Sequence, residues 1–294
     1  MKELKVKPIK VPAGYKHPPA PHPALPNHEF TMGLIAPKGA GKTTVICNLL
    51  EFYKGYFHTI LVFSPTIQSD EKWDVIKKQK LVTRNVVLQK WLKEMRDKKN
   101  RHPNPVVHTD EGIADDLDNL IIDPQDFDGM IPEEHFFDGY DDESFREIME
   151  EQMEMIKLLK KHGKPKFWAN RILIIFDDLV GSALFSGTRG SYFKGVNTRH
   201  RHYSASFIMV SQGYKEIPKT IRTNLTCLII FEIGNEKELE AIYEEWPMFL
   251  KKNEWMDLYE YAVKEPYAFM YFNSQKEKKN MRIMRNFDQY LFLK

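Results

Sequence analysis

The sequence predicts an α/β fold with a mainly parallel central sheet that is flanked by helices. Short apolar runs of strand length alternate with longer helical stretches, an order typical of parallel sheets. The run at 171–176 is almost continuously apolar, as expected of a parallel strand that is covered on both faces. A glycine-rich segment at 36–43 joins a strand-like run to a helix-like run, which favours the same fold class.

The spacing of apolar residues assigns the individual elements. Strands are predicted at 30–35, 59–64, 171–176, 206–210 and 226–231, with weaker strand signals at 267–272 and 281–284. Helices are predicted at 43–50, 145–161, 236–246 and 254–264. Because most of 67–165 is polar and poor in strand signals, we expect it to be an insertion or side element on the α/β core.

The N-terminal residues, 1–28, are rich in lysine and proline, and proline at this density prevents regular structure. We therefore predict an extended N-terminal arm that is either disordered or lies along a neighbouring subunit. Residues 29–294 are expected to form one domain, because the chain length of 294 residues suits a single large domain with an insertion. A hydrophobic content of 42% is sufficient for its core.

The composition argues against several classes of protein. Cys47 and Cys227 lie in apolar segments far apart in the sequence, which indicates buried free thiols and a reducing compartment. No apolar run approaches about 18 residues, so no membrane span is expected. The first residues also lack the apolar core of a signal peptide.

Charge is unevenly distributed although the net charge is only +2. Residues 71–101 contain eleven lysines and arginines against four acids, whereas residues 110–154 contain eighteen acids against one arginine. Such asymmetry indicates either a basic functional surface with an acidic surface opposite it, or two solvated helical surfaces.

Residues 36–43 follow the phosphate-binding pattern G-x-x-x-x-G-K-[ST], with alanine in place of the first glycine. Gly39 and Gly41 permit backbone angles that turn N–H groups toward phosphate oxygens, and the N-terminus of the next helix adds partial positive charge. Lys42 is expected to reach the β- and γ-phosphates, and the Thr43 hydroxyl is expected to ligate Mg²⁺. The predicted nucleotide-binding residues are Ala36, Pro37, Lys38, Gly39, Ala40, Gly41, Lys42, Thr43 and Thr44.

Two acidic residues, Asp177 and Asp178, directly follow the strongest predicted strand. An apolar strand that ends in an acid pair is the Walker B pattern, in which the first carboxylate holds the Mg²⁺ shell. The second is placed to orient and deprotonate the attacking water. The pair alone could equally be a helix N-cap or a turn, but ligands of open α/β sheets collect at such strand ends.

Further polar candidates follow later in the chain. Gln212 comes directly after the next apolar strand, where its amide could sense the γ-phosphate or could simply be satisfied within a loop. Arg199, Arg201 and Arg222 are candidate stabilisers of phosphoryl-transfer charge, because a guanidinium can bind two oxygens at once. None has an acidic partner three or four residues away, so each is either such a group or a solvated or DNA-facing arginine.

These segments together resemble the genome-packaging ATPases of large double-stranded DNA viruses, the poxvirus-type branch of the FtsK/HerA superfamily. The resemblance rests on 36–44, 172–178 and 207–212, followed by Ile-Pro-Lys-Thr-Ile-Arg-Thr-Asn at 217–224, its most specific part. It covers roughly residues 28–50 and 170–232. The sequence departs from the family pattern at Ala36 and at Asp178, where many relatives carry glutamate.

The resemblance implies a RecA-like P-loop domain that hydrolyses ATP at the subunit interfaces of a homo-oligomeric ring and drives double-stranded DNA into a preformed capsid. It implies that Lys42 and Thr43 bind nucleotide and metal, that Asp177 binds Mg²⁺, and that Asp178 activates water. Gln212 would sense the γ-phosphate, and Arg199 or Arg201 best matches a trans-acting arginine. The implied partners are DNA of any sequence and a capsid portal or vertex protein. The implied location is the cytoplasm or viral factory of an infected cell, or the virion.

Three other readings remain open from the sequence. A P-loop kinase would be a compact monomer with an arginine-rich lid, whereas the charged insertion here turns acidic. A nucleotide-gated scaffold without turnover would not need the second acid, Asp178. A cellular DNA translocase would usually carry membrane spans or extra domains.

Overall fold

The computed structural model describes residues 16–101, 120–123, 125–179, 181–185 and 191–292. The strands form one sheet in the order β3-β2-β4-β5-β1-β6-β7-β8-β9. Neighbours from β3 to β6 are parallel, and β7 to β9 continue the sheet in antiparallel pairs, so the predicted α/β fold is confirmed. The strands are β1 (Thr31–Ile35), β2 (Thr59–Phe63), β3 (Phe136–Phe137), β4 (Ile172–Asp177), β5 (Ala205–Ser211), β6 (Cys227–Ile230), β7 (Met270–Asn273), β8 (Ile283–Arg285) and β9 (Gln289–Tyr290).

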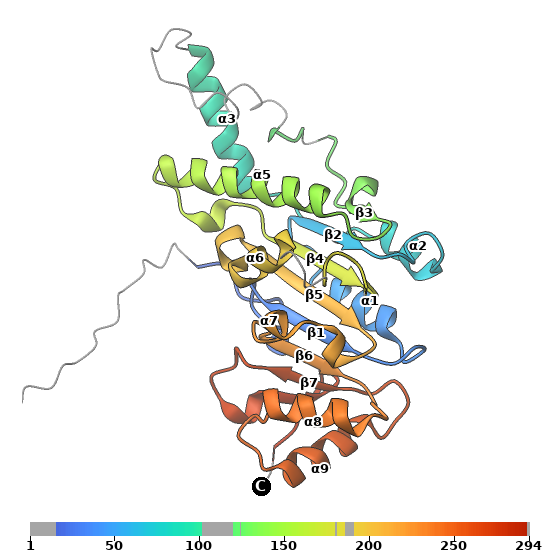
Figure 1. Ribbon diagram of the computed structural model, residues 1–294. Coiled ribbons are helices and arrows are strands. Elements are labelled where there is room, and N and C mark those ends of the chain that lie inside the picture. Colours follow the sequence, from blue (N-terminus) through green and yellow to red (C-terminus); the bar gives the residue numbers. More distant parts are fainter. Residues whose placement is uncertain (1–15, 102–119, 124, 180, 186–190, 293–294) are drawn as a thin grey trace, which may run out of the picture.

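Helices cover both faces of this sheet, while α3 rises beyond its β2–β3 end (Figure 1). The α-helices are α1 (Lys42–Phe52), α2 (Glu71–Lys77), α3 (Val86–Arg101), α5 (Asp142–Lys161), α6 (Tyr192–Thr198), α7 (Lys219–Arg222), α8 (Glu236–Glu245) and α9 (Lys252–Val263). Short 3₁₀ turns are η2 (Glu133–His135), η3 (Lys166–Trp168), η4 (His200–Tyr203), η5 (Tyr214–Glu216) and η6 (Lys279–Met281). No helix among the described residues combines the length and apolar character needed to cross a membrane.

The core consists of two apolar layers, one on each face of the sheet. In β4, Ile174 and Phe176 pack with residues of α5 to α9, whereas Leu173 and Ile175 pack with residues of α1 and α2. Successive side chains of a strand point to opposite faces, so a strand buried on both sides must be apolar at every position. The unbroken apolar run seen in the sequence is explained by this double coverage.

The described part of the N-terminal arm lies against the protein's own core. Ala24 and Leu25 are each only 1% exposed and belong to the layer that contains α1. The Tyr53 hydroxyl donates to the Pro26 carbonyl at 2.6 Å, and the Tyr56 hydroxyl donates to the Pro18 carbonyl at 2.7 Å. Proline residues leave their carbonyls free to accept such bonds, so an irregular segment can still be held firmly. Residues 1–15 lie outside the described part.

The acidic part of the predicted insertion contributes directly to the sheet layers. Helix α5 begins at Asp142, three residues before the predicted start, because the Asp141 side chain accepts hydrogen bonds from the first-turn N–H groups. Phe145 and Met149 of α5 are fully buried against the sheet. Strand β3 pairs in parallel with β2 at the edge of the sheet. Helix α3 packs on α5 through a separate cluster that includes Trp91.

Candidate nucleotide site

The phosphate-binding pattern forms the loop between β1 and α1, at the carboxyl edge of the sheet. Strand β1 lies between β5 and β6, so this loop emerges near the middle of the sheet. Gly39 and Gly41 have φ angles of +81° and +94°, which favour glycine. Gly41 is the N-cap of α1 and gives it no side-chain cap, so N–H groups of the first turn remain available to a ligand. Residues 37–39 and Thr44 are exposed, and Ala40 and Thr43 are partly exposed.

The alanine at the first position of the pattern has a structural reason. The Ala36 side chain is fully buried, and its N–H donates to the Ser211 carbonyl at 3.1 Å, which joins the loop to the end of β5. The Lys42 ammonium folds back over the loop and donates to the Ala36 carbonyl at 3.2 Å. The positive charge of Lys42 therefore lies over the loop.

Asp177 is the last residue of β4 and is only 4% exposed. Ser64 directly follows β2, and its hydroxyl donates to the Oδ2 atom of Asp177 at 3.0 Å. The pKa of Asp177 is raised from 3.8 to about 6, mainly by burial; the Asp178 charge adds to this rise, whereas the Ser64 bond and the Lys42 charge oppose it. Ser64 has no role in the sequence predictions, although its place directly after a buried strand matches that of Asp177 and Gln212.

Asp178 and Gln212 meet at the same edge from neighbouring strands. The Gln212 amide donates to Asp178 Oδ1 at 3.2 Å and lies 3.4 Å from Oδ2. Asp178 adopts a left-handed φ of +51°, which turns its chain out of the strand direction. Asp178 is partly exposed and Gln212 is exposed, so both can reach a ligand. The parallel pairing of β4 with β5 places the two strand ends side by side.

The donors at this edge suit Mg²⁺ held jointly with a phosphate ligand. Among the described residues, no group of three or more acidic, histidine or cysteine side chains could hold a metal alone. Mg²⁺ is commonly bound through one or two carboxylates plus phosphate oxygens and water. Asp177 and the Thr43 hydroxyl match that donor set.

Arg199 and Arg201 lie at the amino ends of the strands, on the side of the sheet away from the phosphate loop. Both are exposed and belong to the segment around η4, which immediately precedes β5. Strand β5 has seven residues, so about 20 Å of strand separates them from Gln212. These arginines therefore cannot reach the loop of their own subunit.

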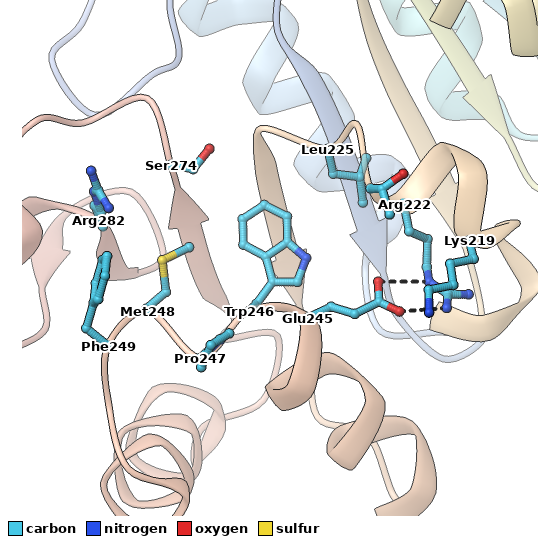
Figure 2. A pocket seen from close by; sticks show the side chains of 11 residues that line it. Lys219, Arg222, Leu225, Glu245, Trp246, Pro247, Met248, Phe249, Ser274 and Arg282 are labelled. Carbon is cyan, nitrogen blue, oxygen red and sulfur yellow. Dashed lines mark hydrogen bonds and ion pairs between the residues drawn. The ribbon is translucent and has the colours of Figure 1, made fainter. Parts of the chain in front are cut away.

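Arg222 is held within the fold by an acidic partner distant in sequence. Its Nη2 and Nε atoms donate to the two carboxylate oxygens of Glu245 at 2.7 and 3.2 Å, and its Nη1 atom donates to the Ile217 carbonyl at 2.8 Å. The guanidinium also lies over the Tyr214 ring, 4.8 Å from its centre. Arg222 and Glu245 form one wall of a cavity of about 610 Å³, which Figure 2 shows. The cavity lies at the amino end of β6, away from the phosphate loop.

Comparisons with known proteins address the family and the fold. The family model described as "Poxvirus A32 protein" matches residues 120–285. The uncharacterized protein 075L of Invertebrate iridescent virus 6 is 27% identical over 149 residues, which is 50% of this chain and 54% of that protein. The match therefore spans about half the length of that relative.

A solved structure of low sequence identity shares the fold. B204, the DNA-packaging ATPase from Sulfolobus turreted icosahedral virus, superposes with a TM-score of 0.50 at 12% identity, covering 88% of this chain and 98% of B204. The genome-packaging NTPase B204 from Sulfolobus turreted icosahedral virus 2, in complex with AMPPCP, has a TM-score of 0.49 at 11% identity, covering 90% and 98%.

The match to the family model includes both acids of the β4 strand end, Gln212 and all three candidate arginines, but it does not include the phosphate loop. The loop is thus identified by its own residues and geometry. Because the model matches more than half of the chain, the chain belongs to the poxvirus A32 protein family.

Proposed function

We propose that this chain is a Mg²⁺-dependent ATPase motor that moves double-stranded DNA and packages a viral genome into a preformed capsid. One observation carries the proposal. The phosphate loop, the buried Asp177 and the Asp178–Gln212 pair converge at one edge of the sheet from three neighbouring strands. A phosphate-binding loop beside a metal-binding carboxylate and a second, accessible carboxylate suits phosphoanhydride hydrolysis.

Each side chain at this edge has a distinct part in the proposed reaction. Lys42 and the N–H groups of the loop bind the phosphates, and Asp178 orients water and accepts its proton. Thr43 and Asp177 would hold Mg²⁺, and the ion would supply positive charge at the phosphate oxygens. Gln212 already donates to Asp178, so a phosphate oxygen would compete with that carboxylate for its amide. This competition is a physical basis for the proposed sensor role.

Membership of the A32 family and the fold shared with B204, a DNA-packaging ATPase, support the coupling to DNA. Basic side chains at the surface would bind DNA phosphates without sequence preference, with an affinity that falls as salt rises. A portal or vertex protein of the capsid is the proposed docking partner. An infected host cell is the proposed location, with the cytoplasm or viral factory as the proposed compartment.

A ring with shared sites is also proposed, because Arg199 and Arg201 are exposed yet remote from their own phosphate loop. Head-to-tail contacts between identical subunits can close into a ring and can bring these arginines to a neighbour's site. An arginine supplied in this way can raise turnover by about 10³–10⁵. Arg222, which is paired with Glu245, is the weaker candidate.

The test is the ATPase rate with and without double-stranded DNA, measured across a range of protein concentrations. We expect dependence on Mg²⁺, stimulation by DNA, and specific activity that rises with concentration. Lys42→Ala should remove nucleotide binding, whereas Asp178→Asn should bind nucleotide and fail to hydrolyse it. Hydrolysis by Asp178→Asn at the parent rate would refute its role as the base. Full activity in a dilute monomer, without any effect of DNA, would instead favour a kinase or another monomeric P-loop enzyme.

Mixed subunits test the shared site directly. An Arg201→Ala subunit retains its own loop and acids, and an Asp178→Asn subunit retains its arginines. Mixing the two inactive variants should restore part of the activity, because some interfaces then join an intact acid to an intact arginine. Arg199→Ala in the same mixture tests the alternative arginine. Arg222→Ala tests the third candidate, and if none of the three arginine variants is complemented, the shared-site proposal is wrong.

A further inference from the structure

An exposed aromatic side chain, Tyr267, lies directly against the phosphate loop. A Cβ atom built on Gly41 would lie 3.4 Å from Cδ1 of the Tyr267 ring, which is ordinary van der Waals contact. Gly41 is the N-cap of α1 and immediately precedes Lys42. The ring therefore borders the part of the loop where the phosphates are proposed to bind, although 226 residues of sequence separate the two positions.

The Tyr267 ring is exposed to solvent, and the backbone conformation of Tyr267 is energetically unfavourable. Tyr267 is 71% exposed and has a φ of +65°, a left-handed conformation that is unfavourable for a bulky aromatic residue. Its neighbours Ala268 and Phe269 are buried, and the Phe269 N–H donates to the Asn286 side chain at 3.3 Å. The tight turn is thus anchored in the core while its aromatic ring is turned outward. Among the described residues, the Tyr267 hydroxyl has no hydrogen-bond partner that would explain this arrangement.

The position of Tyr267 in the sheet indicates what it could bind. Asp178 and Gln212 end β4 and β5, which lie on one side of β1, whereas Tyr267 precedes β7, which lies beyond β6 on the other side. If the terminal phosphate of a triphosphate points toward Asp178 and Gln212, the nucleoside end extends from the loop toward β6 and β7. An accessible aromatic face stands on that side.

We propose that Tyr267 is the platform on which the base of the nucleotide stacks. This inference rests on the proposed function, since it assumes that the loop binds a nucleoside triphosphate. Stacking on one aromatic ring is worth about 5- to 150-fold in affinity and tolerates different bases, because every base has a π-face. The site therefore favours nucleotides over base-free polyphosphates and discriminates only weakly between ATP and GTP.

Phe249, near the amino end of β6, offers a matched control for Tyr267. Phe249 is 69% exposed and has a φ of +70°, so it shares both the exposure and the backbone conformation of Tyr267. It lines the cavity at the amino end of β6, as Figure 2 shows, and its ring contacts the Lys279 ammonium. Replacing Phe249 by alanine therefore reproduces the loss of an exposed, left-handed aromatic residue without touching the phosphate loop.

The test is direct binding, measured by titration calorimetry with Mg²⁺ and three ligands: AMPPCP, GMPPCP and inorganic tripolyphosphate. Tyr267→Ala should weaken binding of both nucleotides by about tenfold or more and leave tripolyphosphate binding unchanged. Tyr267→Phe should bind all three ligands as the parent does, and so should Phe249→Ala. Circular dichroism melting of each variant checks that the fold is intact, as expected for replacements of exposed rings.

Two results would overturn the assignment of Tyr267. Equal weakening for nucleotides and tripolyphosphate would mean that the ring only shapes the loop, and unchanged nucleotide binding would mean that the base lies elsewhere. In both cases the parent still binds triphosphates and the proposed function stands. A parent protein that binds none of the three ligands would overturn the proposed function together with this inference.

Discussion

Replacing Asp177 by asparagine should stabilise the ligand-free protein at neutral pH. The carboxylate is 4% exposed, and its pKa is raised from 3.8 to about 6, mainly by burial. At about 1.4 kcal/mol per pH unit, a rise of this size corresponds to about 3 kcal/mol of lost stability when the group is ionised. Asparagine carries no charge and can still accept the hydrogen bond from Ser64, so it should recover up to about 3 kcal/mol.

The sign of the pH dependence follows from the raised pKa. Above pH 6 the folded protein keeps a buried carboxylate ionised, whereas the same group is fully hydrated in the unfolded chain. As the pH falls from 6 toward 3.8, the folded state takes up a proton that the unfolded state does not yet bind, so the parent gains stability. The advantage of Asp177→Asn should therefore be largest above pH 7 and should vanish near pH 4.

Urea denaturation in the presence of EDTA, at several pH values between 4 and 8, measures this difference. Asp178→Asn is the comparison variant, because it removes the neighbouring carboxylate, which is partly exposed, and leaves the buried one in place. Excess Mg²⁺ and AMPPCP should then stabilise the parent but not Asp177→Asn, since ligands stabilise the state that binds them. If Asp177→Asn is less stable than the parent at pH 7.5, or if the difference does not change with pH, burial of the charge is not the dominant effect.

Three further outcomes are expected. The contribution of His28 to stability should fall below about pH 6.5, by up to about 1.4 kcal/mol per pH unit and opposite in sign to that of Asp177, because burial holds the pKa of His28 well below 6.5; urea titrations of His28→Gln against the parent isolate this contribution. Arg222→Ala should destabilise the fold by about 3 kcal/mol, because it leaves the Glu245 carboxylate without its cationic partner. The double variant Arg222→Ala/Glu245→Gln should recover part of that loss, as measured in a double-mutant cycle. Gln212→Ala should bind AMPPCP normally but lower turnover by about tenfold or more in single-turnover assays.

The central strands were predictable because burial on both faces leaves a local mark in the sequence. Strands β1, β2, β4 and β5 lie within one residue of their predicted ends at every boundary. The same logic places Asp177 and Gln212, since polar residues directly after such runs must lie at the carboxyl edge of a parallel sheet. Local patterns therefore sufficed to place the loop between β1 and α1 and the strand ends beside it.

Contacts between distant segments were not predictable, because nothing in the neighbouring residues reports them. Arg222 looks unpaired in the sequence, yet its partner Glu245 is 23 residues away on another helix. The prolines of the N-terminal arm indicate irregular structure correctly, but the tyrosine hydroxyls that hold it belong to the α1 region. Ser64 and Tyr267 lie near the site because of the positions of β2 and β7 in the sheet, which local sequence does not reveal.

Features that are unfavourable for stability gather at the edge where the ligand is proposed to bind. Asp177 is a buried charge, and Asp178 and Tyr267 have left-handed backbones without being glycine. Ser204 is left-handed too, but it is buried and its carbonyl accepts a hydrogen bond from buried His28. Under the proposed function, further compensating groups come from outside the chain: a metal ion for Asp177, water for Asp178 and a base for Tyr267. Nucleotide and Mg²⁺ should therefore stabilise this protein more strongly together than either does alone.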